Sequence, residues 1–269
     1  MAIITISRGS YSYGSQIAEK VAQRLGYSCI SRDLLLEASE HFNIPEIRLT
    51  KALEDAPSVF DRFTHEKEHY MAFIEAALLE HALRDNMVYH GFAGHLLLGG
   101  VTHVLKVRII ASLEDRARIV MESEDISREK AIHLLKKIDE QRREWGLKLY
   151  GVEISDASLY GLVINIDQVK FNDAVDIICH TARLESFELT DESQSALKDV
   201  LLAAKMKASL VSIISNVVVT AKDGTVFVNA MTDVSAESQV KSEIREVAEK
   251  IPGVVDVKIN IDFTTPRFL

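Results

Sequence analysis

The first 185 residues alternate short apolar, β-branched runs with longer segments of helical periodicity. The chain opens with such a run at 3–7, continues through a turn rich in glycine and serine, and then carries Ile17, Val21 and Leu25 at helical spacing. Later runs that predict strands are 28–30, 87–90, 104–111 and 162–166, and segments that predict helices are 33–41, 58–84, 113–123, 127–148 and 172–183. Such alternation builds a mostly parallel sheet with helices on both faces. We therefore predict an α/β fold for this part of the chain.

The turn at residues 8–15 has the order expected of a phosphate-binding loop. A strand that feeds a glycine-containing turn and then a helix points backbone N–H groups and the positive end of the helix dipole at an anion. Gly9 and Gly14 are separated by four residues, as in G-x-x-x-x-G-K-[ST]. Ser15 stands where that motif has the phosphate-binding lysine, and Gln16 stands where it has the magnesium-binding hydroxyl. The motif alone leaves both a phosphate site and a purely structural turn open.

The character of the chain changes near residue 186. A polar linker leads into a helical pattern that Thr190 or Asp191 would cap. Two β-branched runs flank Asp223-Gly224, which predicts a hairpin, and a further helix and an alternating strand at 254–261 follow. The expected order is αββαβ. We therefore predict two domains, 1–186 and 187–269.

Composition and charge narrow the possible functions. The chain has 31 Lys+Arg against 40 Asp+Glu, a net charge of −9, which disfavours binding of nucleic acid through a broad basic face. Cys29 and Cys179 are far apart in sequence, unlike a disulfide framework or a thiolate zinc site. The first residues lack the pattern of a signal peptide, and no stretch approaches the ~20 apolar residues that span a bilayer. We expect no nucleic-acid partner, no transmembrane segment and a cytoplasmic location.

A series of short motifs runs along the first domain in a fixed order. It comprises residues 3–8, Gly14 and 17–26, then Arg32-Asp33-Leu-Leu, and then 88–97, 113–116, 138–142 and 156–165. In this order the motifs resemble those of the cytidylate kinase-like family, a branch of the nucleoside monophosphate kinases with P-loop folds. The resemblance covers roughly residues 1–185. It implies a P-loop kinase-like parallel sheet with a helical lid.

The resemblance also implies an activity and a set of site residues. The activity is transfer of the γ-phosphoryl group of ATP, with Mg²⁺, to a nucleoside monophosphate such as CMP. Residues implied to bind the nucleotide phosphates are Arg8, Gly9, Ser10, Tyr11, Ser12, Tyr13, Gly14, Ser15 and Gln16. Arg32 and Asp33 are implied to contact the acceptor nucleotide.

Phosphoryl transfer needs several cations converging on three phosphates, and the family pattern supplies candidates. Arg116 and Arg142 are the predicted catalytic arginines, the second on a charged helix, 136–148, that could close as a lid. Asp139 would orient Arg142 or a magnesium-bound water. Asp139 and Arg142 are three residues apart on one helix, so a simple structural ion pair remains the alternative.

Two departures from the family pattern weaken the case for catalysis. Ser15 replaces the P-loop lysine, or the arginine that this branch often carries, and Phe92 stands where the family commonly has an arginine. Loss of such donors costs on the order of 10²–10³ in rate each. Two hypotheses therefore stay open: an active nucleotide kinase, and a sensing or scaffold protein that binds a nucleotide as an effector without turnover.

The second domain resembles a BON domain, a small module associated in other proteins with phospholipid or envelope interactions. The resemblance rests on Thr225-Val-Phe-Val, the following helix, and residues 251–257. The segment from 187 onward has nine Lys+Arg against twelve Asp+Glu, a balance that favours a regulatory or dimerising lobe over binding to anionic lipid. Homo-oligomer formation and a protein or lipid contact are both possible here.

Histidines offer little support for metal chemistry. The run 65–69 satisfies H-E-x-x-H, yet its two central residues are charged and only His69 flanks the apolar stripe of its helix. His90 and His95 show no ligand spacing, so we expect packed or surface imidazoles. No protein metal site is predicted.

Overall fold

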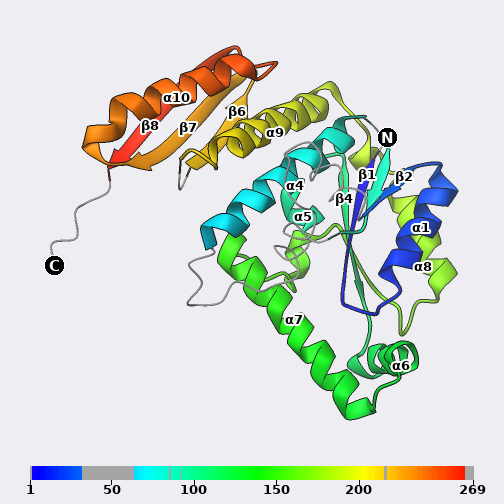
Figure 1. Cartoon of the computed structure of the whole chain (residues 1–269). Coiled ribbons are helices and arrows are strands. Elements are labelled where there is room, and N and C mark those ends of the chain that lie inside the picture. The colour runs from blue at the N-terminus through cyan, green and yellow to red at the C-terminus, as the bar shows by residue number, and fades with distance from the viewer. Residues whose placement is uncertain (1, 32–63, 85, 92, 215–216, 264–269) are drawn as a thin grey trace.

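A computed structural model describes residues 2–31, 64–84, 86–91, 93–214 and 217–263 (Figure 1). The predicted helix at 33–41 and the candidate site residues Arg32, Asp33 and Phe92 lie outside these ranges.

The larger unit is built on a sheet of five parallel strands among the described residues. In spatial order the strands are β2 (Ser28–Ile30), β3 (Met87–Tyr89), β1 (Ile3–Arg8), β4 (Val104–Ile110) and β5 (Leu162–Asn165). β1 lies between β3 and β4, with Ser7 opposite Arg108. Ile4 and Ile6 of β1 are fully buried, as expected for a strand covered on both faces. The predicted parallel α/β fold is confirmed.

Helices cover both faces of this sheet (Figure 1). On one face α1 (Gly14–Leu25) and α8 (Phe171–Thr181) pack over the strands, with Ile17, Val21 and Ile178 fully buried. On the other face lie α4 (Thr64–Arg84) and the short α5 (Gly94–Leu97), packed around buried residues that include Ile74 and Leu97. Single-turn 3-10 helices occur at Ala157–Leu159, Glu185–Phe187 and Val234–Ala236.

Two helices extend beyond the sheet as a pair. α6 (Leu113–Glu124) and α7 (Arg128–Tyr150) pack through Ala117, Val120, Ala131 and Leu135. Ser112 and Ser127 cap them, since each side-chain oxygen accepts a backbone N–H three residues on. α7 runs to Tyr150, two residues past the predicted end, and stops at Gly151 in the left-handed conformation. A glycine in this conformation commonly ends a helix.

The C-terminal segment has the predicted αββαβ order. Its elements are α9 (Asp191–Leu210), β6 (Val217–Lys222), β7 (Thr225–Thr232), α10 (Glu237–Lys250) and β8 (Asp256–Phe263). Thr190 caps α9 in a capping box with Ser193. β6 and β7 form the predicted antiparallel hairpin, whose turn residues Asp223 and Gly224 both have positive φ.

The last strand begins two residues later than its apolar pattern predicted. Gly253 has a φ of 98°, and the N–H of Val255 donates to the carbonyl of Gly224 in the hairpin turn at 2.8 Å. Val254 and Val255 therefore belong to the connection, and β8 pairs in parallel with β7 from Asp256 onward.

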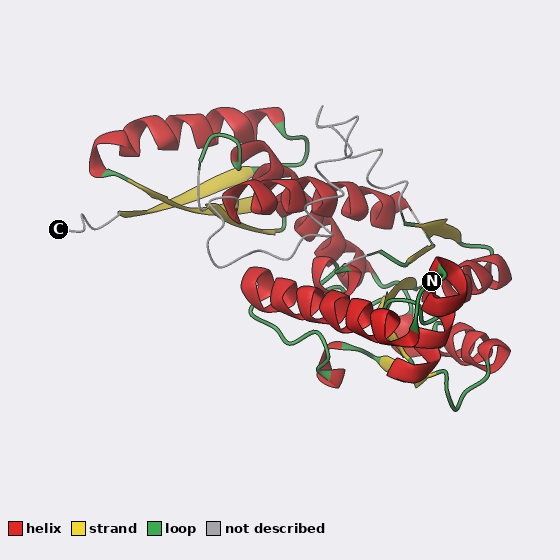
Figure 2. Ribbon diagram, turned by 60° about the horizontal axis from the view of Figure 1, so that its bottom comes forward, coloured by secondary structure: helices red, strands yellow, loops and turns green. Residues whose placement is uncertain are grey.

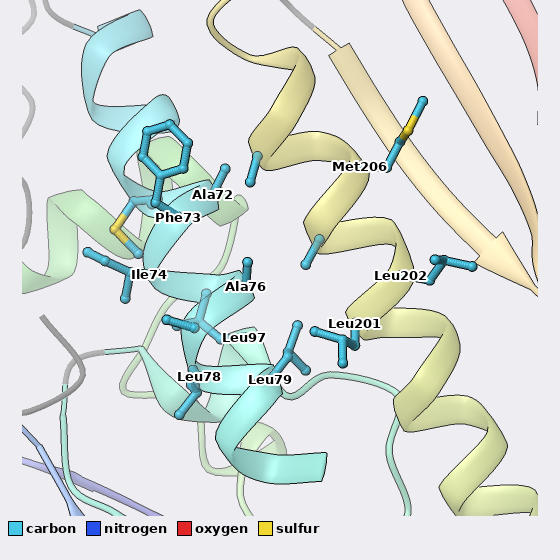
Figure 3. Close-up of a cluster of buried hydrophobic side chains, with 14 of the residues drawn as sticks. Ala72, Phe73, Ile74, Ala76, Leu78, Leu79, Leu97, Leu201, Leu202 and Met206 are labelled. Atoms are coloured by element: carbon cyan, nitrogen blue, oxygen red, sulfur yellow. The ribbon is translucent and has the colours of Figure 1, made fainter. Parts of the chain in front are cut away.

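The C-terminal unit is joined to the larger one along α4 and α9 (Figure 3). The close-up shows these two helices side by side, with Leu79 and Leu201 directed toward each other and Met206 toward the C-terminal sheet. Lys205 of α9 pairs with Glu80 of α4 at 2.7 Å. The two predicted units therefore share one continuous hydrophobic core.

Candidate functional site

The loop between β1 and α1 is held in an unusual backbone conformation. Tyr11 and Tyr13 have φ of 57° and 56°, a region that costs energy for residues with a side chain. The Ser12 hydroxyl donates to the carbonyl of Gly9 at 2.8 Å and closes the loop on itself. α1 begins at Gly14, so its free N–H groups and the positive end of its dipole face the loop.

Glycine at position 14 is required by a side chain of the loop itself. A Cβ placed on Gly14 would lie 2.5 Å from Cδ and 2.8 Å from Cβ of Arg8. A Cβ on Gly9 would lie 3.1 Å from Nη1 of Arg116. A larger residue at position 14 would therefore displace the Arg8 side chain.

Arg116 is the most rigidly held cation of the site. It lies in the first turn of α6, is 8% exposed, and donates from Nη1 and Nη2 to the two carboxylate oxygens of Asp139 on α7 at 3.0 and 2.7 Å. A bidentate pair of this kind fixes the plane of the guanidinium. The sequence predicted that Asp139 would orient Arg142 or a magnesium-bound water, and in the structure its carboxylate pairs with Arg116.

Arg142 reaches the loop from α7. Its Nη1 donates to the backbone carbonyl of Arg8 at 2.9 Å. Burial lowers its pKa to about 10, with further lowering by Arg8, Arg116 and Arg108 and opposition from Asp139. Burial also lowers the pKa of Arg8. Positive charge is thus concentrated where little water solvates it, a condition that a bound polyanion would relieve.

These arginines border a cavity of about 790 Å³ at the carboxyl ends of the parallel strands. Crevices at this edge of an open α/β sheet are the usual ligand sites of such folds. The cationic side chains that line the cavity are Arg8, Arg108, Arg116, Lys136, Arg142 and Arg143, and the acidic ones are Asp139, Glu140 and Glu153. The cavity therefore suits an anionic ligand.

Two smaller cavities continue from the large one along the loop. The first, of about 280 Å³, is lined by seven of the predicted loop residues (Arg8, Ser10, Tyr11, Ser12, Tyr13, Ser15 and Gln16) together with Ile119 and Arg142. The second, of about 320 Å³, is lined by Tyr13, Arg118, Ile119 and Phe171 among others. Shared residues link the three: Arg8 and Arg142 border the first and the large cavity, and Tyr13 and Ile119 border both small ones.

Sequence reasoning missed a polar group in the wall of the large cavity. Arg108 of β4 donates to the carbonyl of Ile154 and to the hydroxyl of Tyr160, the latter at 3.0 Å. That hydroxyl lies 3.1 Å from Nε2 of His95. Burial, together with the charges of Lys106 and Arg108, lowers the pKa of His95 to about 4, so its ring is neutral at pH 7.

A signal for this group was present in the sequence. The strand Val-Leu-Lys-Val-Arg-Ile-Ile carries Lys106 and Arg108 two residues apart among apolar residues. Two cations on one face of a central parallel strand need a polar environment, and a cavity at that face supplies it.

The remaining candidates are placed as follows. Ser15 and Gln16 lie in the first turn of α1, where the Ser15 hydroxyl donates to Oε1 of Gln16 at 2.9 Å. Among the described residues, no group of three or more His, Cys, Asp and Glu side chains is arranged to hold a metal ion. The side chains of 65–68 in the H-E-x-x-H run are outside that description. None of the helices within the described ranges has the length and apolarity needed to cross a membrane.

Fold and site together define a parallel α/β protein with an arginine-lined cavity beside the loop that follows its first strand. The chain belongs to the cytidylate kinase-like family, whose model matches residues 3–168. The matched region includes the loop, α6 and α7 and ends before α8.

Individual relatives agree with this assignment. A cytidylate kinase of Pyrobaculum aerophilum is 26% identical over 178 residues, which cover 66% of this chain and 90% of the relative. A cytidylate kinase of Sulfolobus acidocaldarius is 27% identical over 176 residues, which cover 65% of this chain and 91% of the relative. Among solved structures, an uncharacterized protein from Eubacterium ventriosum matches with a TM-score of 0.50 and 18% identity, covering 68% of this chain and 98% of its own. That last similarity concerns the fold.

Proposed function

We propose that this protein is a nucleoside monophosphate kinase, which transfers the γ-phosphoryl group of ATP to a CMP-like acceptor. The observation that carries the proposal is the convergence of Arg8, Arg116 and Arg142 on a loop at a helix N-terminus. Catalysis of phosphoryl transfer consists mostly of positioning and of stabilising charge on the transferring group. Membership of the cytidylate kinase-like family supports this chemistry.

The two small cavities suit the donor nucleotide. The loop cavity offers backbone N–H groups and two arginines to the phosphates. The cavity beyond it presents the ring of Tyr13, which is 45% exposed, the ring of Phe171 and the guanidinium of Arg118. Aromatic rings and a guanidinium plane are surfaces on which a purine base stacks. We assign the base of ATP to this second cavity.

The arginines also account for the missing P-loop lysine. Arg8 and Arg142 line the same small cavity as Ser15, so cations reach the loop from the preceding strand and from α7. Asp139 holds Arg116 in one orientation, which lowers the reorganisation needed when charge develops. Magnesium would supply further neutralisation of the phosphates. Magnesium usually keeps several water and phosphate ligands, and the Ser15 and Gln16 oxygens at the loop are the protein groups that would contact it there.

The large cavity suits the acceptor. Its volume of about 790 Å³ is within the usual range of small-molecule sites. Arg108 and His95 line it, each in contact with the buried hydroxyl of Tyr160, and Arg8 and Arg142 border it on the side of the loop. The acceptor phosphate would face those two arginines. Arg32 and Asp33, by resemblance to the family, would complete the acceptor site.

A variant of Arg116 tests this arrangement. Arg116→Gln should lower the turnover for phosphoryl transfer from ATP by on the order of 100-fold, because a fixed donor to the transferring group is lost. Arg128→Gln is the matched control: Arg128 is exposed on the next helix and pairs with Glu114, away from the cavities. Equal activity of the two variants would contradict the proposed role.

One observation favours the alternative of a nucleotide-binding protein without turnover, namely Ser15 at the lysine position. Two measurements distinguish these functions: thermal denaturation with nucleotides and an assay of product formation. A sensor would be stabilised by nucleotides in thermal denaturation and would form no product. A kinase would be stabilised by nucleotides and would also form the diphosphate product.

For the C-terminal unit, 187–269, we propose a regulatory or dimerising role. Its αββαβ order agrees with the predicted BON-like module. Its excess of acidic residues disfavours binding to anionic lipid. A cytoplasmic location remains our expectation for the whole protein.

A further inference from the structure

We infer that β8 is a dimerisation strand, which pairs antiparallel with β8 of a second copy of this chain about a two-fold axis at Asn260. In the three-stranded sheet the order is β6-β7-β8, so β8 is an edge among the described residues. An edge strand presents a row of backbone N–H and C=O groups with no neighbouring strand. The inference does not depend on the proposed kinase activity.

The edge is long, and it lies away from the larger unit. β8 spans eight residues, and all of them pair in parallel with β7 on the inner side. α9 packs on the β6 side of the sheet and contacts α4, whereas β8 lies at the far side beside the C-terminal end (Figure 1). Figure 2 shows α10 on one face of this sheet, with the outer side of β8 clear of the described helices.

The side chains of β8 alternate in chemistry between the two faces of the sheet. Val257, Ile259 and Ile261 are half-buried and lie opposite the buried β7 residues Val226, Val228 and Ala230, on the face that packs against the helices. The exposed face carries Asp256, Lys258, Asn260 and Asp262. A partner strand must match apolar residues on one face and charges on the other.

A second copy of β8 meets this requirement over the greatest length of strand when the two-fold axis lies at Asn260. With the two-fold axis at Asn260, Lys258 of each copy is opposite Asp262 of the other, and the two Asn260 side chains face each other. On the helix-packed face, Ile259 is opposite Ile261, and Val257 is opposite Phe263, which is 47% exposed in the single chain. Opposite charges and apolar pairs in directly opposed positions both stabilise antiparallel strands.

Other registers are less favourable. An axis at residue 259 opposes Asp256 with Asp262, and an axis at 258 or 262 opposes two like charges of the same residue. An axis at 257 or 261 opposes no like charges, but it pairs only three or five residues of β8, against seven for the axis at Asn260. An axis between two residues places apolar side chains opposite charged ones. A lysine on an edge strand commonly prevents pairing with other chains, but in the favoured register Lys258 has a carboxylate opposite it. Isologous contacts of this kind give closed dimers.

Charge reversal of the full-length chain tests the register. Lys258→Asp and Asp262→Lys should each raise the dimer dissociation constant by about tenfold or more, because both symmetric ion pairs become repulsive. The double variant Lys258→Asp/Asp262→Lys should restore the wild-type constant. Lys222→Asp is the matched control, an exposed lysine on the opposite edge strand. Sedimentation equilibrium over a concentration series measures all five proteins.

A cross-link provides a second measurement that does not depend on charge. Directly opposed residues of antiparallel strands have Cβ atoms about 5 Å apart, within reach of a disulfide after small adjustment. Asn260→Cys should therefore give a covalent dimer on mild oxidation, and Asn229→Cys, exposed on the same face of central strand β7, should not. Wild type controls for Cys29 and Cys179. A wild-type chain that is monomeric throughout, or a dimer unaffected by both single reversals and not cross-linked at 260, overturns the inference.

Discussion

Arg142 lies where the loop cavity and the large cavity meet, and its charge is poorly solvated. Its side chain bonds a backbone carbonyl and has no carboxylate partner among the described hydrogen bonds, so it contributes little to folding of the free protein. We expect Arg142→Met to lower kcat on the order of 100-fold while the melting temperature without nucleotide stays the same or rises. Lys137→Met, an exposed lysine on the same helix, is the control. A destabilised Arg142→Met variant with normal turnover would show that the residue is structural.

The absence of a side chain at Gly14 leaves the space that the Arg8 side chain occupies. Because an added Cβ would lie 2.5 Å from the Arg8 side chain, Gly14→Ala should displace Arg8 and weaken nucleotide binding. Gly161→Ala is the matched control, since its nearest neighbours would lie at 3.5 Å, an ordinary contact. Nucleotide-induced stabilisation, followed by thermal denaturation, should be lost only in the first variant. An unchanged response in Gly14→Ala would contradict the role given to Arg8.

At the scale of elements, helix α4 carries Glu75, a carboxyl group whose charged form is destabilised by burial. Glu75 faces α9 near Lys207 and α7 near Tyr150, and burial raises its pKa, with partial opposition from Lys207. A carboxyl group whose pKa is raised on folding stabilises the fold at low pH and loses that contribution as the pH rises through its folded pKa. Glu75→Gln should therefore raise the melting temperature at pH 7, and the gain should shrink as the pH falls toward 4. A constant gain across this range would contradict the assignment.

The sequence was a good guide to elements and a poorer one to pairings between them. Strand and helix order, the cap at Thr190 and the Asp223-Gly224 turn depend on local patterns, and local patterns predicted them. The partner of Asp139 could not be predicted in this way. Helical spacing favoured Arg142 on the same helix, but the packing of α6 on α7 brings Arg116 closer. The Arg108–Tyr160–His95 group likewise joins three separate segments through tertiary packing.

At the scale of the whole molecule, the C-terminal unit covers an apolar face of the larger one. Ala72, Ala76 and Leu79 of α4 are buried in one cluster with residues of α9 (Figure 3). A chain truncated after residue 186 would expose this face, and we expect it to aggregate or to melt at a markedly lower temperature. A chain that ends at 214 keeps α9 and should be partly rescued. Size-exclusion chromatography and thermal denaturation measure both, and a stable, monomeric 1–186 fragment would show that the units are independent.

In the function that we propose, the three linked cavities hold a donor and an acceptor nucleotide for direct phosphoryl transfer. The most direct measurement is product formation by the purified full-length protein with ATP, Mg²⁺ and each nucleoside monophosphate in turn, followed by ³¹P NMR. We expect CMP to be converted to CDP with one ADP formed for each CDP, and we expect Arg116→Gln, but not Arg128→Gln, largely to abolish the reaction. Stabilisation of the protein by ATP without diphosphate formation from any nucleoside monophosphate would contradict it.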